Sequence, residues 1–133
     1  MNDKNKLSIV SCTGEYWEFI RQLRMDPRVI SGFVKTTPIT PAMQSKYMKY
    51  HANDYRIALL DGIPVGFVGV IEGDIRVCTH PEYQGIGIGK FMIKECIKVW
   101  PNAFAKIKIN NEASIKLFQN CGFKKKYVIL EKD

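Results

Sequence analysis

Three glycines recur at every second position between Gln84 and Lys90, in the stretch Q-G-I-G-I-G-K. Glycine weakens a strand interior, so this spacing favours a loop whose backbone lies close to another group. The bare N–H groups of such a loop, the positive end of a helix that begins there and the charge of Lys90 would together attract an anion. The stretch therefore predicts a cradle for pyrophosphate. A tight turn that binds nothing is the alternative.

Two common phosphate-binding motifs do not fit this stretch. The P-loop requires a glycine where Gln84 stands and a hydroxyl residue where Phe91 stands. The dinucleotide motif requires a wider glycine spacing and an acidic residue at a strand end about 20 residues later, which is missing here. What remains is a strand, a glycine-rich loop and a helix.

The rest of the chain predicts the elements that position this loop. Strands are predicted over residues 6–12, 55–60, 63–71, 75–79, 103–109 and 123–130, and helices over 14–25 (continuing over 27–35), 41–51, 88–99 and 111–120. Asp61-Gly62 is typical of a two-residue hairpin, and Thr40 before Pro41 is typical of a helix start. The order β-α-α-β-β-β-α-β-α-β indicates one α+β domain over residues 1–133, with a mixed, mostly antiparallel sheet flanked by helices.

Composition excludes several classes of protein. The chain has 133 residues, 46% of them hydrophobic, which is too apolar for a disordered chain. It has neither an apolar run long enough to span a membrane nor a signal-peptide pattern, so a cytoplasmic protein without a membrane partner is expected. The four cysteines form no C-x-x-C pair, so no metal is predicted. The net charge of +7 favours an anionic partner, either a phosphorylated small molecule or, less favoured, nucleic acid.

Two motifs in this order resemble a known family. Gln84, Gly87 and Gly89 fit the pattern [Q/R]-x-x-G-x-[G/A], and residues 111–123, N-E-A-S-I-K-L-F-Q-N-C-G-F, are similar to the helix N-x-x-A-x-x-L-Y-x-x-x-G-F. Both patterns are typical of the GNAT superfamily of acetyl-CoA-dependent N-acetyltransferases. The resemblance covers roughly residues 55 to 125 and implies a GNAT-like fold with acetyl-CoA as cosubstrate.

The resemblance also implies how acetyl-CoA would be held. The strand 75–79 would splay from the next one, and the pantetheine arm would pair with it as an added strand. An N–H there would stabilise the oxyanion that forms on the acetyl group. The cofactor-binding residues implied are Val77, Cys78, Thr79, Gln84, Gly85, Ile86, Gly87, Ile88, Gly89, Lys90 and Asn111.

The catalytic residues are less clearly marked. The amine must lose a proton before it attacks, and Asp74, then Glu72, are the predicted bases. The tyrosine that usually serves as the family's general acid is replaced by Phe118. Tyr127 is the predicted substitute; Tyr83, Cys121 or a water are further possibilities. Cys78 as an acyl-carrying nucleophile is disfavoured, because it matches a position that contacts the cofactor.

The acceptor and the assembly are the remaining expectations. The resemblance implies an acceptor pocket within residues 15–51, where arginines near aromatic residues favour a planar or phosphorylated acceptor. The stretch L-R-M-D-P-R-V-I…P-I-T…Q-S-K-Y also resembles members of the family that acetylate nucleotide-linked amino sugars, so a small anionic amine of this kind is expected. A protein amino group or an aminated nucleobase stays open, as does a non-catalytic acyl-CoA-binding or nucleic-acid-binding module. Only ten residues follow Phe123, enough for one strand where the family has two. A homodimer that pairs or exchanges this edge strand is therefore predicted.

Overall fold

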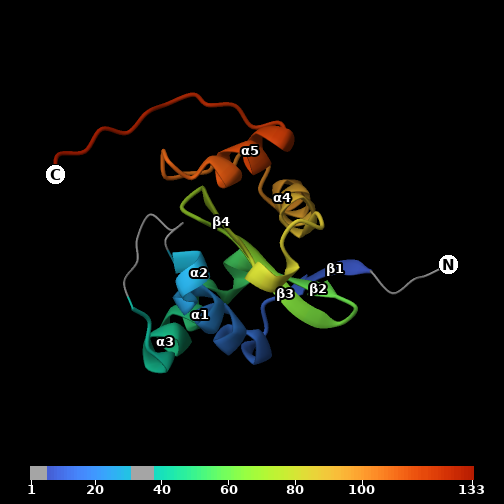
Figure 1. The fold of residues 1–133 in the computed structure, drawn as a ribbon. Coiled ribbons are helices and arrows are strands. Elements are labelled where there is room, and N and C mark those ends of the chain that lie inside the picture. Colours follow the sequence, from blue (N-terminus) through green and yellow to red (C-terminus); the bar gives the residue numbers. More distant parts are fainter. Residues whose placement is uncertain (1–5, 31–37) are drawn as a thin grey trace.

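The sheet forms the centre of the molecule. The computed structural model describes residues 6–30 and 38–133, and in this part of the chain the sheet has four strands in the order β1-β2-β3-β4. They span Leu7–Ser11 (β1), Tyr55–Leu60 (β2), Ile63–Ile71 (β3) and Asp74–Thr79 (β4). Every neighbouring pair is antiparallel. The predicted α+β class is confirmed, with helices on both faces of the sheet (Figure 1).

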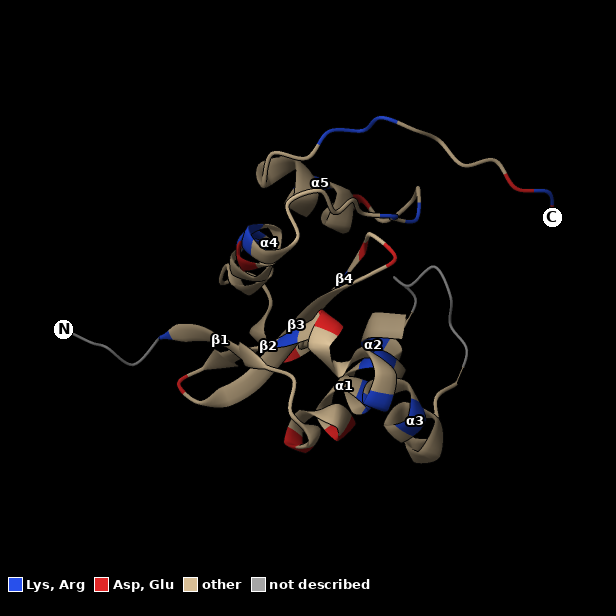
Figure 2. Ribbon diagram, turned by 180° about the vertical axis from the view of Figure 1, so that it is seen from behind, with Lys and Arg blue, Asp and Glu red and all other residues tan. Residues whose placement is uncertain are grey.

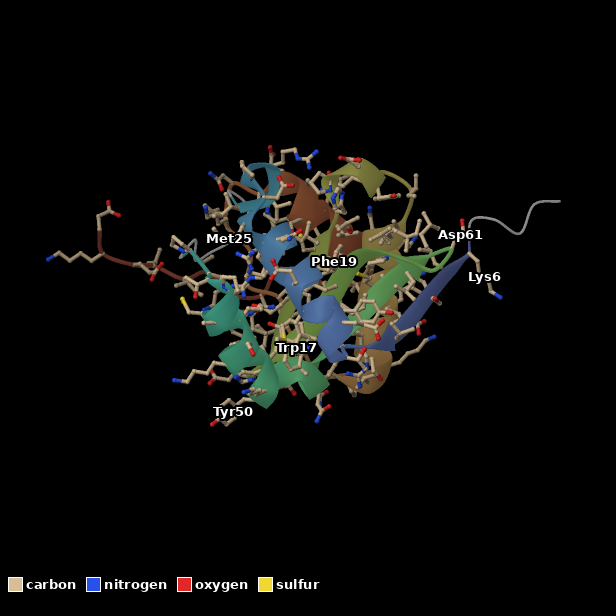
Figure 3. The ribbon with its side chains drawn as sticks, turned by 90° about the horizontal axis from the view of Figure 1, so that it is seen from below. Lys6, Trp17, Phe19, Met25, Tyr50 and Asp61 are labelled. Carbon is tan, nitrogen blue, oxygen red and sulfur yellow. The ribbon has the colours of Figure 1, made fainter. Side chains whose placement is uncertain are left out.

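Two tight turns join the last three strands. Asp61 and Gly62 both have positive φ (52° and 85°), the conformation of a two-residue hairpin turn, as predicted. Glu72 and Gly73 repeat it, with φ of 52° and 83°. The first turn also holds β1 in place, because the Lys6 N–H donates to Asp61 Oδ1 at 3.0 Å. Figure 3 shows these two residues together at the tip of the sheet.

Three helices cover one face of the sheet. After a 3-10 turn (Gly14–Tyr16) they are α1 (Trp17–Met25), α2 (Pro27–Ile30) and α3 (Pro41–His51). The predicted order had two helices here; the structure separates the short α2, and residues 31–35 of the predicted continuation lie outside the described residues. Thr40 caps α3 by accepting the Met43 N–H at 3.1 Å, as expected for its type. A second 3-10 turn, Ala52–Asp54, leads into β2.

Two helices cover the other face. They are α4 (Ile88–Val99), preceded by a 3-10 turn at Pro81–Tyr83, and α5 (Glu112–Asn120). Strand alternation divides the core between the faces. Val68 and Ile75 pack with Met92 of α4, whereas Phe67 and Cys78 pack with the α1 and α3 side.

Two predicted strands are wrong. Residues 103–109 form no strand; Phe104 alone makes a parallel bridge, to Asp74, so the sheet is mixed only at this point. Residues 123–130 are also outside the sheet, and the chain beyond α5 runs outward from the body (Figure 1). Both segments have strand-like sequences, but a strand forms only where a partner strand supplies the hydrogen bonds.

Candidate functional site

The glycine loop ends at the N-terminus of α4. Gly87 is the residue before the helix and has φ of 91°, a conformation that a side chain rarely adopts. The first helical bond runs from the Phe91 N–H to the Gly87 carbonyl at 3.0 Å. Within the described part of the chain, the N–H groups of residues 87–90 donate to no acceptor. Four adjacent donors at the positive end of a twelve-residue helix form a site that fits an anion.

The three glycines of the loop differ in their roles. Gly85 and Gly87 have positive φ, and a Cβ added to either would meet nothing within 4 Å. These two positions therefore require glycine for their backbone conformation and not for close packing. At Gly89 an added Cβ would lie 3.0 Å from Leu117 Cδ2. Gly89 therefore lets α5 pack closely on α4. Gln84 and Lys90, at the two ends of the loop, are exposed.

Among residues 6–30 and 38–133, no strand covers one edge of β4, which leaves it open to a ligand. The Ile75 N–H donates away from the sheet to the Phe104 carbonyl (2.8 Å), and the His80 N–H donates towards β3, to Val65 (2.7 Å). Because backbone groups alternate along a strand, Val77 and Thr79 direct their N–H and C=O groups to the outer edge. Cys78 differs from these two, because its backbone faces β3 and its side chain is buried. Burial raises the pKa of the Cys78 thiol to about 12, which keeps it protonated at neutral pH.

The predicted bases lie at the opposite end of β4. Asp74 Oδ1 accepts the Lys106 N–H at 3.1 Å, and Asp74 Oδ2 lies 3.3 Å from Arg76 Nε. The hydrogen bond to the Asp74 carboxylate thus helps to hold residues 104–106 beside β4. Glu72 is exposed in the preceding turn.

The remaining predicted site residues lie on or beyond α5. Asn111 caps this helix, with its Oδ1 accepting the Ser114 N–H at 3.2 Å. Phe118 is buried, its ring centroid 5.1 Å from that of Phe123, so the position of the family's usual acid belongs to the core. Tyr127 belongs to the segment after α5, which runs outward from the body, and its side chain is exposed.

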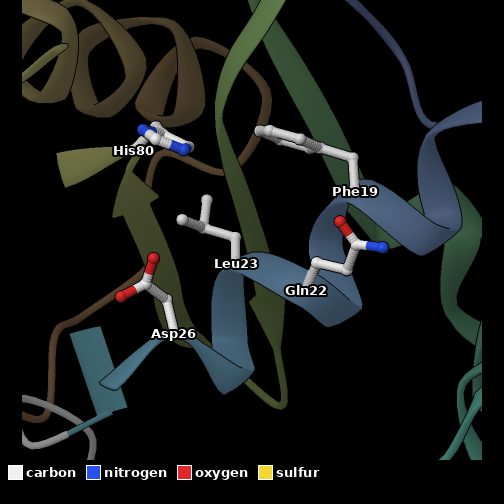
Figure 4. A pocket seen from close by; sticks show the side chains of 5 residues that line it. All are labelled: Phe19, Gln22, Leu23, Asp26 and His80. Atoms are coloured by element: carbon white, nitrogen blue, oxygen red, sulfur yellow. The ribbon is translucent and has the colours of Figure 1, made fainter. Parts of the chain in front are cut away.

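A cavity on the other side of β4 falls in the region where the acceptor pocket was expected, residues 15–51, but it also includes His80, which the sequence did not connect with that region. It has a volume of about 270 Å³ and lies between α1 and the residue that follows β4 (Figure 4). Its lining residues are Phe19, Gln22, Leu23, Asp26 and His80. Helical spacing places Phe19, Gln22 and Leu23 on one side of α1, but no local pattern connects them to His80.

Charged groups define the polar side of this cavity. Hydrogen bonds from the Arg28 side chain and backbone lower the pKa of Asp26 to about 2, so Asp26 is ionised. His80 Nδ1 accepts the Glu82 N–H at 3.1 Å, which leaves the proton of a neutral ring on Nε2. The cavity therefore combines an anion, a ring N–H and the Gln22 amide with apolar walls, and it suits a small polar molecule.

Neither membrane spans nor metal sites are found in residues 6–30 and 38–133. No helix there has the length and apolarity to cross a membrane, and no three histidine, cysteine or acidic side chains gather as a metal site would need.

Comparison with known proteins identifies similar folds. Residues 17–123 match the family described as "Acetyltransferase (GNAT) family". A domain from Methanocaldococcus jannaschii DSM 2661 is 25% identical, with a TM-score of 0.78 over 92% of this chain and 90% of that one. Spermidine N-acetyltransferase from Vibrio cholerae, solved with CoA and spermine, is 17% identical, with a TM-score of 0.80 over 98% and 87% of the two chains.

A ribosomal-protein-alanine N-acetyltransferase from Brucella melitensis is also similar. It is 20% identical, with a TM-score of 0.73 over 88% of this chain and 84% of that one. No curated protein sequence matches the chain significantly. At these identities the two named enzymes show the fold alone.

Proposed function

The chain belongs to the GNAT acetyltransferase family, and we propose that it transfers the acetyl group of acetyl-CoA to a small primary amine by direct attack. The free N–H groups of residues 87–90 at the start of α4 carry this proposal. They offer several donors and a positive helix end to one anion, as a pyrophosphate requires. The open edge of β4 lies directly before this loop, so a ligand held by its pyrophosphate can extend along the strand.

The chain's own groups account for binding and orientation. When bound, acetyl-CoA supplies an activated thioester. Residues 84–90 would hold its pyrophosphate, and the outward groups of Val77 and Thr79 would pair with the pantetheine arm. One of these outward N–H groups would also donate to the acetyl oxygen as negative charge develops on it. Cys78, with its backbone turned to β3, would contribute packing.

The cavity between α1 and His80 is the proposed acceptor site. It lies on the α1 side of β4, whereas the glycine loop leads to α4 on the other side, so donor and acceptor would approach the strand from opposite faces. Asp26, Gln22 and His80 would orient a polar amine there. Asp74 is the proposed base and Glu72 the second candidate; because both lie at the opposite end of β4 from His80, this role requires the amine to extend from the cavity along the strand. Tyr127, the proposed proton donor, is exposed, so this role requires its segment to dock.

We propose that the acceptor also carries an anionic group, as in an amino sugar phosphate or a nucleotide-linked amino sugar. Figure 2 shows basic residues on α1 and α2, and α1 also supplies three of the residues that line the cavity. Arg28 binds Asp26 at the cavity wall with more than half of its side chain exposed, so its guanidinium can still contact a ligand. Arginine suits phosphate because it can bind two oxygens at once.

Thiol release from acetyl-CoA tests the proposal. The amine panel would contain amino sugars with and without a phosphate or nucleotide, a polyamine and a peptide with a free N-terminus. Turnover with one class and none without amine is expected. Gln22→Leu should raise the acceptor KM several-fold and leave acetyl-CoA binding unchanged, whereas Gln119→Leu, an exposed change on α5, should alter neither.

Two outcomes would contradict the enzymatic function. Tight acetyl-CoA binding without turnover on any amine would favour a non-catalytic acyl-CoA-binding module. Salt-sensitive binding to DNA or RNA without turnover would favour a nucleic-acid-binding module.

A further inference from the structure

Arg24 is a half-buried cation on the side of α1 that faces the sheet. It follows Ile20 by four residues, and Ile20 is buried together with side chains of the sheet, so both lie on the same side of the helix. In the described part of the chain, the Arg24 side chain makes no hydrogen bond or ion pair. The neighbouring acid, Asp26, binds Arg28 instead, at 2.8 Å. A guanidinium removed from water without an anion is unfavourable, so this position suits a ligand that supplies one.

Arg76 extends from β4 on the same face of the sheet. Side chains alternate along a strand, and Cys78 packs with the α1 and α3 side, so Arg76 and Asp74 belong to that face as well. Arg76 Nε lies 3.3 Å from Asp74 Oδ2, whereas its two terminal nitrogens make no hydrogen bond within residues 6–30 and 38–133. The Arg76 side chain is 42% exposed, so these nitrogens are accessible to a ligand.

Tyr55 lies between the two arginines. In the sheet, Gly69 of β3 pairs with Tyr55 on one side and with Arg76 on the other. A Cβ added to Gly69 would lie 2.5 Å from Tyr55 Cδ1, so the tyrosine ring lies across this glycine and extends towards β4. Burial raises the pKa of the Tyr55 hydroxyl, which therefore stays protonated. Arg24 and Arg76 both act on this pKa in the opposite direction, as expected of two guanidinium groups close to the hydroxyl.

A pair of hydroxyl groups adds a hydrogen-bond donor to this place. Tyr47 Oη lies 2.8 Å from Tyr55 Oη. This bond uses one of the two hydroxyl protons, so the other can donate to a ligand. The two arginines and Asp74 together carry one net positive charge. The arrangement therefore suits a group with a single negative charge and several acceptor oxygens, as each phosphate of a phosphodiester has.

We propose that Arg24 and Arg76, with the hydroxyl pair of Tyr47 and Tyr55, bind a phosphate group of the acceptor. This inference deepens the proposed function and rests on its placing of the acceptor on the α1 side of β4. An acceptor that extends from the cavity along β4 towards Asp74 passes Arg76, so one molecule can present both an amine and a phosphate. The two arginines also select against a cationic acceptor such as a polyamine.

Titration with inorganic phosphate tests the site without catalysis. The side-chain Nε–H signals of Arg24 and Arg76 in the NMR spectrum should shift and saturate, and they report this site whether or not the glycine loop also binds phosphate. Arg24→Gln should weaken the binding seen at Arg76 about 10-fold or more, because charge-assisted hydrogen bonds are lost. Arg24→Lys should lose less, because it keeps the charge but not the fork of donors.

The control for this titration is Lys49→Gln, which removes one exposed positive charge from α3. It should bind phosphate at Arg24 and Arg76 like the native chain. Arginine signals that phosphate leaves unmoved would overturn the proposal, as would equal losses of binding in Arg24→Gln and Lys49→Gln.

Steady-state kinetics tests the role in acceptor choice, with an amino sugar and its nucleotide-linked form as the two acceptors. Arg24→Gln should raise the KM of the nucleotide-linked acceptor about 10-fold or more and leave both the KM of the plain amino sugar and the affinity for acetyl-CoA unchanged. Arg76→Gln repeats the test from the strand, and circular dichroism checks that both variants fold. Equal effects on the two acceptors would overturn the proposal. Absence of turnover with any amine would instead contradict the proposed function, and the phosphate titration would then decide the anion site by itself.

Discussion

Gly87→Glu is the most informative single change in the proposed cradle. Gly87 has φ of 91° and open space where a Cβ would stand, so the variant keeps its fold at a backbone cost of about 1–2 kcal/mol. Its carboxylate would lie beside the bound pyrophosphate. At about 4 Å and an effective dielectric constant of about 20 this repulsion is about 4 kcal/mol. Because Gly87 is exposed, screening reduces it to about 2 kcal/mol, a loss of about 30-fold in affinity.

Calorimetric titration with CoA measures this loss, and the chain offers a matched control. Gly62 is also exposed, has φ of 85° and would place a Cβ in open space, but it lies in the β2–β3 turn. Gly62→Glu adds the same strain and charge and should bind CoA like the native chain. Gly87→Ala separates backbone strain from charge and should lose less than Gly87→Glu. Native affinity in Gly87→Glu, or equal losses in both glutamate variants, would refute the cradle.

Four further changes test other parts of the structure. Cys78→Ala should reduce the rate of acetyl transfer by no more than a few-fold, because the buried thiol has a pKa of about 12 and stays protonated. Complete loss of activity in a folded variant would instead support a mechanism in which Cys78 carries the acetyl group. Asp74→Ala removes the acceptor of the Lys106 N–H and should lower the free energy of unfolding by about 1.5–3 kcal/mol in urea titrations. Thr40→Ala removes the α3 cap and should cost about 1 kcal/mol in the same assay. Arg28 lowers the Asp26 pKa from 3.8 to about 2, so its stabilisation is complete only above about pH 5 and is lost progressively as the pH falls through 2 towards about 1. Melting temperatures of Asp26→Asn should therefore fall less over this range than those of the native chain, and parallel curves would contradict the pairing.

Turns and helix caps could be predicted from the sequence, because each depends on a few neighbouring residues. The Asp61-Gly62 turn and the Thr40 cap depend on residues within one turn, and both are confirmed. The glycine loop before α4 was predicted for the same reason. The direction of each backbone group in β4 was less visible to the sequence. Cys78 was expected to pair with the cofactor like Val77 and Thr79, but its backbone groups face β3 instead.

Pairing between distant segments could not be predicted from alternation alone. Apolar and polar side chains alternate along residues 103–109 as they do in a strand, but in the structure only Phe104 pairs with β4, through its bridge to Asp74. The bond from the Lys106 N–H to Asp74 has no local signature, because its partners meet only through the fold. The cavity is of the same kind, since α1 and His80 become neighbours only once the sheet forms.

Backbone amide shifts during titration with acetyl-CoA test the central claim most directly. The account predicts that the N–H signals of residues 85–90 shift together and saturate, with Val77 and Thr79 next, while those of the Asp61-Gly62 turn stay unchanged. The three glycines of the loop make this readable, because glycine amides fall in a separate region of the spectrum. Saturating acetyl-CoA that leaves residues 85–90 unmoved would contradict the account, since the ligand would then lack the cradle on which the proposed function rests.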